Sequence, residues 1–134
     1  MQITLISFGY KTGMIPMSNL VFDVRFLKNP YWDEKLRPLS GLDPAVQEYV
    51  LSQPTAVDFL NILLPFLKAF INCFQQSEPT EIKIAFGCTG GQHRSVAMVE
   101  AVAKALQESI PGAVINVSHE GLQTPAGHNG EHNG

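Results

Sequence analysis

Residues 82–96 read IKIAFGCTGGQHRSV, an apolar run that passes through glycines into a segment rich in helix-forming residues. The run Ile82 to Phe86 has the β-branched and aromatic content of a buried strand, and residues 92–108 have the composition of a helix. A helix start leaves unpaired N–H groups and a partial positive charge, and glycines let the backbone close around an anion. The junction is therefore predicted to be a phosphate-binding loop, in which Arg94 adds a two-pronged contact. Its candidate ligand-binding residues are Thr89, Gly90, Gly91, Gln92, His93, Arg94 and Ser95.

The rest of the chain alternates strand-like and helix-like segments. Strand patterns occupy residues 2–8, 20–24, 82–86 and 113–117, and helix patterns occupy residues 44–51, 55–75 and 92–109. Pro65 lies inside the longest helix pattern and is predicted to kink or split it. The alternation predicts an α/β fold with a small, mostly parallel four-stranded sheet flanked by helices. In such sheets ligands bind beyond the carboxyl ends of the strands, where Gly9, Arg25, Cys88 and His119 would emerge.

The segment over residues 26–42 is too broken for a helix and too long for an ordinary connection, so we expect a functional loop. Just before it, Asp23 and Arg25 flank Val24 and project to the same side. They are candidate ligand-binding residues, and the alternative is that they pair with each other. Within the loop, Tyr31 and Trp32 form either a stacking wall for a sugar or base or a lid over the core.

Composition limits the class of protein. The 134 residues fit one domain, taken as residues 1–120, followed by a Gly/Asn/His tail over residues 121–134 that is predicted to be disordered. A formal charge of −3 gives no overall basic field for nucleic acids. The two cysteines do not suggest a disulfide framework, and no leader or uninterrupted apolar span is visible, so we expect a cytoplasmic protein away from membranes. No metal site and no cofactor are expected.

Cys88 raises a rival interpretation. Together with Arg94 and Ser95 it fits the pattern Cys-x5-Arg-Ser/Thr of cysteine-dependent phosphatases, in which a thiolate attacks phosphorus while the arginine holds the oxygens. His93 stands where that loop usually has glycine, and no general acid can be identified among the aspartates. The other interpretation of Cys88 is a small buried side chain at a strand end, with no enzymatic role.

Four stretches together resemble one known family, the C-terminal domain of the RapZ/YvcJ proteins, which are RNase adapter or nucleotide-binding proteins. The stretches are Ser7-Phe8-Gly9-Tyr10-Lys11-x-Gly13, residues 21–32 from VFDVRFL to Trp32, residues 36–43 from Leu36-Arg37-Pro38 to Asp43, and residues 87–96. They follow one another in order, and the resemblance as a whole covers residue 2 to about residue 119. Such an ordered set is more specific than a single glycine loop.

The resemblance implies a regulatory module that binds a phosphorylated metabolite, an amino-sugar phosphate or a nucleotide-sugar, rather than a phosphatase. In the family this domain senses glucosamine-6-phosphate, contacts a small RNA and forms oligomers, so a protein partner, RNA and a homo-oligomer are possible partners. The implied pocket uses Asp23, Arg25, Thr89, Gly90, Gly91, His93 and Arg94.

The chain departs from the family in three places. Tyr31 stands where RapZ has a histidine, and the region after His119 lacks the family's basic tail, which weakens the expectation of RNA binding. The chain also has no Gly-x4-Gly-Lys-Ser/Thr motif, so the family's ATPase half is expected to be absent.

Overall fold

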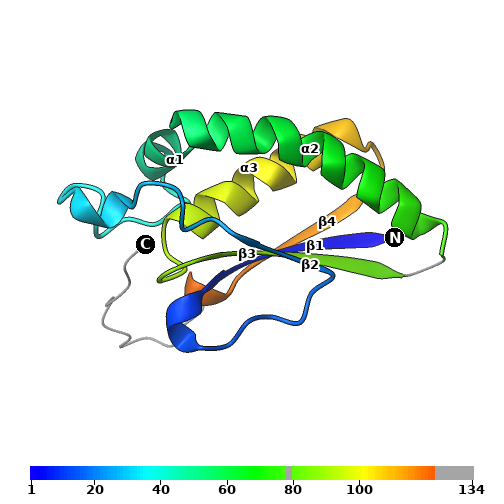
Figure 1. Ribbon diagram of the computed structural model, residues 1–134, viewed down its shortest axis with the longest axis horizontal. Coiled ribbons are helices and arrows are strands. Elements are labelled where there is room, and N and C mark those ends of the chain that lie inside the picture. Colours follow the sequence, from blue (N-terminus) through cyan, green and yellow to red (C-terminus); the bar gives the residue numbers. More distant parts are fainter. Residues whose placement is uncertain (78–79, 123–134) are drawn as a thin grey trace.

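The computed structural model describes residues 1–77 and 80–122, and within them one sheet is covered by helices (Figure 1). The strands are β1 (Gln2–Gly9), β2 (Leu20–Asp23), β3 (Glu81–Cys88) and β4 (Val114–His119). The α-helices are α1 (Pro44–Leu51), α2 (Pro54–Gln75) and α3 (Arg94–Ser109). Three short 3-10 helices lie in the connections: η1 (Tyr10–Thr12), η2 (Pro30–Trp32) and η3 (Glu120–Leu122).

The sheet has the order β2-β3-β1-β4, and every pairing in it is parallel. The predicted α/β fold with four strands is confirmed, and the sheet is parallel throughout rather than mostly so. Two central strands, β1 and β3, pair along their full length, from Gln2 opposite Glu81 to Gly9 opposite Cys88. Because all four strands point the same way, their carboxyl ends meet at one edge of the sheet.

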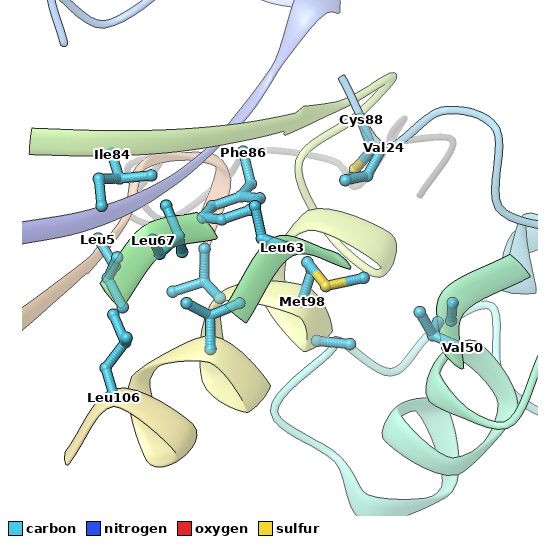
Figure 2. Close-up of a cluster of buried hydrophobic side chains, with 14 of the residues drawn as sticks. Leu5, Val24, Val50, Leu63, Leu67, Ile84, Phe86, Cys88, Met98 and Leu106 are labelled. Carbon is cyan, nitrogen blue, oxygen red and sulfur yellow. The ribbon is translucent and has the colours of Figure 1, made fainter. Parts of the chain in front are cut away.

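The main core lies between the sheet and the helices, which Figure 1 shows on one side of it. Alternate residues of β1 and β3, such as Leu5, Ile84 and Phe86, point into this layer, as the period of two in a strand requires. Figure 2 shows that Leu63 and Leu67 of α2 pack against these strand residues, as do Met98 and Leu106 of α3. A smaller cluster of Ile6, Phe8 and Ala85 packs with Tyr10.

The element boundaries differ from the predicted ones by a few residues. The helix after the glycine loop begins at Arg94 rather than Gln92, and β3 extends two residues further, to Cys88. Gly121 and Leu122 belong to η3, and the remaining part of the predicted tail, residues 123–134, lies outside the described residues. Such shifts are expected because pattern reading places element ends less well than element types.

Pro65 does not split the second helix, because α2 is continuous from Pro54 to Gln75. The residue is exposed, and so is Asn61 one turn earlier, whose carbonyl loses its usual donor. At an exposed position a freed carbonyl is open to solvent, which reduces the cost of proline in a helix interior. The buried stripe of α2 is formed by Ala56, Leu63, Leu67 and Ile71.

By length and composition alone α2 could cross a membrane, with a mean hydropathy of 1.5 over its apolar window. Its buried stripe packs against the sheet and α3, and Asp58 and Lys68 lie on its exposed side. These features make α2 a core helix of this fold rather than a clear membrane span.

Candidate functional site

The polar residues singled out in the sequence gather at the carboxyl edge of the sheet. Strand pairing sets Gly9 opposite Cys88, Asp23 opposite Gly87, and Ser7 opposite His119. The predicted convergence of the strand ends is therefore confirmed. Loop residues 89–93 and the start of α3 follow directly from the β3 end of this edge.

Close backbone packing explains why glycine occupies position 91 in the loop and positions 9 and 121 beside it. Gly91 has a φ of +72°, and a Cβ on it would lie 2.8 Å from the nitrogen of Gly9. A Cβ on Gly9 would lie 2.6 Å from the carbonyl carbon of Gly90, and one on Gly121 would lie 2.4 Å from the oxygen of Gly91. We call this contact between the end of β1, the loop and η3 the glycine seam, comprising Gly9, Gly90, Gly91 and Gly121. Gly9, Gly91 and Gly121 are therefore required by the fold itself, with or without a ligand.

Arg94 opens α3 and reaches back across the junction. Its Nη1 group donates to the carbonyls of Arg25 and Leu27, both at 3.0 Å, and its Nη2 group lies 3.3 Å from the Thr89 hydroxyl. The residue is only 5% exposed. Burial lowers the pKa of Arg94, and Cys88 and Asp23 act in the opposite direction. The guanidinium group is therefore held in a fixed orientation at the edge of the site, beside the half-buried Thr89.

Asp23 and Arg25 form the ion pair that the sequence left as an alternative. The Nη2 of Arg25 lies 2.7 Å from Oδ2 of Asp23, and both side chains are 47% exposed. The hydrogen bonds from Arg25 hold the pKa of Asp23 below its usual range, with a smaller contribution from Arg94. The Arg25 guanidinium also stacks 3.9 Å from the centre of the Tyr10 ring. This pair lies at the exposed rim of the site, next to the buried Arg94.

The side chains of the half-buried Gln92 and the buried His93 bind the backbone of residues 36–41. The Gln92 side-chain amide donates to the carbonyls of Arg37 and Leu39, at 3.1 and 2.6 Å. His93 is fully buried, and its Nε2 lies 3.1 Å from the carbonyl oxygen of Leu36. Desolvation lowers the pKa of His93, so the ring is neutral and Nε2–H donates. These two side chains are not brought to the exposed part of the predicted site.

Cys88 and Ser95 lie together beneath the loop. The thiol donates to the Ser95 hydroxyl at 3.1 Å, and the Ser95 backbone N–H donates to the sulfur at 3.3 Å. Both side chains are fully buried, so neither reaches a ligand at the surface. A nucleophile has to contact phosphorus, and this enclosed thiol does not favour the phosphatase interpretation.

A polar chain that sequence reasoning missed lies behind the seam. The Nδ1 atom of His119 lies 2.6 Å from the Ser7 hydroxyl, and its Nε2 lies 2.7 Å from a carboxylate oxygen of Glu100. Ser7 is fully buried, so the chain serves to join β1, β4 and α3 rather than to attack a substrate. The available signal was a polar residue at an inward position of each of two neighbouring strands.

Elsewhere on the described surface, a depression of about 400 Å³ lies between α1 and α3, lined by Gln47, Leu51, Glu100, Ala101, Lys104, Ala105 and Glu108. It contains none of the predicted site residues. Among the described residues no group of three or more His, Cys, Asp or Glu side chains is arranged to hold a metal ion.

The family model for the RapZ C-terminal domain matches residues 1–123. The chain belongs to the RapZ C-terminal domain family. In this RapZ C-terminal domain an all-parallel sheet of four strands is combined with three α-helices. The four stretches that suggested the family lie at the ends of strands, in the loops that follow them and at the start of α3.

Similar members of the RapZ family are named nucleotide-binding proteins. One from Listeria innocua is 48% identical over 107 residues, which is 80% of this chain and 37% of that protein. One from Listeria monocytogenes is 43% identical over 126 residues, covering 94% of this chain and 42% of that protein. One from Mycobacterium avium is 43% identical over 116 residues, covering 87% and 39%. The chain therefore spans about two fifths of the length of the curated relatives it matches.

Proposed function

We propose that this domain is a regulatory module that binds a phosphorylated metabolite, an amino-sugar phosphate or a nucleotide-sugar, at the carboxyl edge of its sheet. The observation that carries the proposal is the convergence of two arginines and one hydroxyl. Arg94 Nη2 lies beside the Thr89 hydroxyl, and the side chain of Arg25 is half exposed. The pKa of Arg94 is lowered mainly by burial and also by the nearby positive charge of Arg25. Two guanidinium groups and a hydroxyl make a set of donors suited to phosphate oxygens.

The roles within this site follow from exposure. Thr89 and Arg94, with the N–H groups of the loop at Gly90, would contact the phosphate, since they lie where β3 opens into α3. Arg25 and Asp23 would contact the remainder of the ligand from the rim, where a carboxylate accepts hydrogen bonds from hydroxyl or amino groups. Gln92, His93 and Ser95 would hold the loop without touching the ligand.

The comparisons support a ligand of this class, because the relatives are named nucleotide-binding proteins. We infer that a protein partner reads the bound state, as a non-enzymatic ligand-binding module requires a recipient for its signal. RNA binding, a homo-oligomer and a cytoplasmic location rest on the family resemblance and the composition alone. A gel shift with structured RNA tests the first: no shift at low salt rejects it.

The test of the proposal is thermal stabilisation by a panel of inorganic phosphate, glucosamine-6-phosphate and a UDP-sugar at constant ionic strength. A ligand present at 100 times its Kd stabilises a folded protein by about 2.7 kcal/mol, which for a domain of this size raises the Tm by roughly 8 °C. Thr89→Val keeps the shape of the side chain but removes its hydroxyl, and Arg25→Ala removes the exposed cation. Both variants should lose most of the stabilisation.

Lys104→Ala is the matched control for Arg25→Ala, because it also removes one exposed positive charge, but from the far part of α3. It should respond to the panel as the parent does. If the whole panel leaves the parent's Tm unchanged, or if Lys104→Ala loses as much stabilisation as Arg25→Ala, the proposed site is wrong.

A further inference from the structure

Three consecutive residues of the glycine loop hold the long segment 25–41. The Gln92 side chain donates to two of its carbonyls, and the Gln92 carbonyl accepts the N–H of Gly41 at 2.9 Å. His93 donates to the carbonyl of Leu36. Arg94 donates through Nη1 to the carbonyls of Arg25 and Leu27. The loop thus contacts this segment near its beginning and throughout its last third.

The middle of the segment has attachments of its own: the Gln53 side chain accepts the N–H of Lys28 at 2.8 Å and donates to its carbonyl at 3.3 Å, and Arg37 donates to the carbonyl of Tyr31 at 2.7 Å. Residues 25–41 contain no strand and no α-helix, only η2 and turns. Leu27, Pro30 and Leu36 are buried, but Trp32 is 74% exposed and Tyr31 packs edge to face against it. Such a segment, with few buried side chains of its own, takes its position from its attachments.

Arg94 connects these attachments to the proposed anion site. Its Nη2 lies beside Thr89, where the phosphate would bind, while both hydrogens of Nη1 serve carbonyls of the segment. A guanidinium group is planar and rigid, so a displacement of Nη2 toward an anion moves Nη1 as well. The carbonyls of Arg25 and Leu27 then have to follow or lose their donor.

We propose that Gln92 and His93 are positioning residues that, with Arg94, make the conformation of residues 25–41 depend on whether the loop is occupied. This inference rests on the proposed function and adds how the bound state is transmitted. The recipient of the change is the exposed corner formed by Tyr31 and Trp32, in which Trp32 is 74% exposed. Aromatic residues of this kind are frequent anchors in protein interfaces.

The first experiment measures ligand-induced change at this corner. Trp32 is the sole tryptophan of the chain, so its emission reports on the segment alone. The parent and Gln92→Ala are titrated with inorganic phosphate and glucosamine-6-phosphate at constant ionic strength, with affinity measured separately by calorimetry. Gln92→Ala should bind within about threefold of the parent Kd, a difference of under 1 kcal/mol, yet show less than half of the emission change.

Gln107→Ala is the matched control, because it removes a glutamine side chain that donates to a backbone carbonyl, that of Ala113, at the other end of α3. It should keep both affinity and emission change. A full emission change in Gln92→Ala overturns the proposal, because the ligand would then contact Trp32 directly. Binding without any emission change in the parent overturns it too.

The second experiment needs no ligand. Hydrogen exchange of the amides in residues 33–41 should be several-fold faster in Gln92→Ala than in the parent, and unchanged in Gln107→Ala. Equal exchange in the two variants overturns the attachment of the segment to the loop. The two failures are distinguishable: if calorimetry detects no binding of any probe, the proposed function fails, and faster exchange still establishes the attachment alone.

Discussion

Replacing Gly91 with alanine tests whether the glycine seam is as tight as the structure indicates. The backbone at this position has φ +72°, and the new Cβ would lie 2.8 Å from the Gly9 nitrogen and 3.0 Å from the carbonyl carbon of Phe8. Both of these atoms belong to the backbone of β1, which cannot rotate away as a side chain would. The substitution therefore has a conformational cost and a steric cost.

Gly13→Ala separates the two costs. Gly13 has φ +76°, nearly the same as Gly91, but a Cβ there would meet nothing within 4 Å. A left-handed conformation costs an alanine about 1 to 2 kcal/mol, and the lower entropy of the stiffer unfolded chain offsets this by under about 1 kcal/mol. Gly13→Ala should therefore lower the free energy of unfolding by about 1 kcal/mol. Forcing a methyl group into packed surroundings adds about 1 to 3 kcal/mol, so Gly91→Ala should lose about 2 to 4 kcal/mol.

Urea denaturation followed by far-ultraviolet circular dichroism measures both variants without any ligand, and the corresponding drop in Tm is roughly 3 °C for each kcal/mol. An equal loss in Gly91→Ala and Gly13→Ala would refute the reasoning, because it would mean that the end of β1 yields to the new methyl group. The loop glycines would then have to be explained by a ligand rather than by the seam.

Three further outcomes are expected. Leu67 is fully buried, so Leu67→Ala should lower the free energy of unfolding in urea by about 2 to 5 kcal/mol. Ile62 on the same helix is 74% exposed, so Ile62→Ala should change it by under about 1 kcal/mol. Equal losses would show that α2 does not pack as described. His93 has a lowered pKa when folded, so the unfolded chain binds more protons and the His93 contribution to stability is present above about pH 6.5 and is lost as the pH falls below it. His93→Gln should make the Tm depend less on pH between 5 and 7. An unchanged pH dependence would contradict the lowered pKa of His93 in the folded protein. An aryl phosphate should not be hydrolysed faster by the parent than by Cys88→Ser, and turnover that disappears in this variant would restore the phosphatase interpretation.

The sequence was informative about the fold because its signals are local. The strand and helix patterns, the Asp43 N-cap with Pro44 behind it, and the alternation of strands and helices all follow from residues close together in the chain. The parallel sheet then determined that the polar strand ends would share one edge. The predicted split at Pro65 does not occur, and sequence alone does not specify whether a helix continues past a proline, because this depends on whether the freed carbonyl is exposed.

The site was harder to predict because its side chains choose between partners far apart in the chain. Nothing in residues 92 and 93 indicates that their side chains bind carbonyls more than fifty positions earlier rather than a ligand. The partnership of Ser7, His119 and Glu100 likewise joins three elements. Residue type and spacing therefore placed these residues in one region of the fold, and the partner of each side chain became visible only in the three-dimensional structure.

The glycine seam also has a mechanical consequence. The backbones of β1, the loop and η3 touch there without intervening side chains, so the loop has no space to move toward β1 or η3. Toward residues 25–41 its contacts are hydrogen bonds made by side chains, which tolerate small rotations. The loop can therefore be displaced only away from β1 and η3, toward residues 25–41. The glycine seam would stay fixed while the segment that carries Trp32 moves.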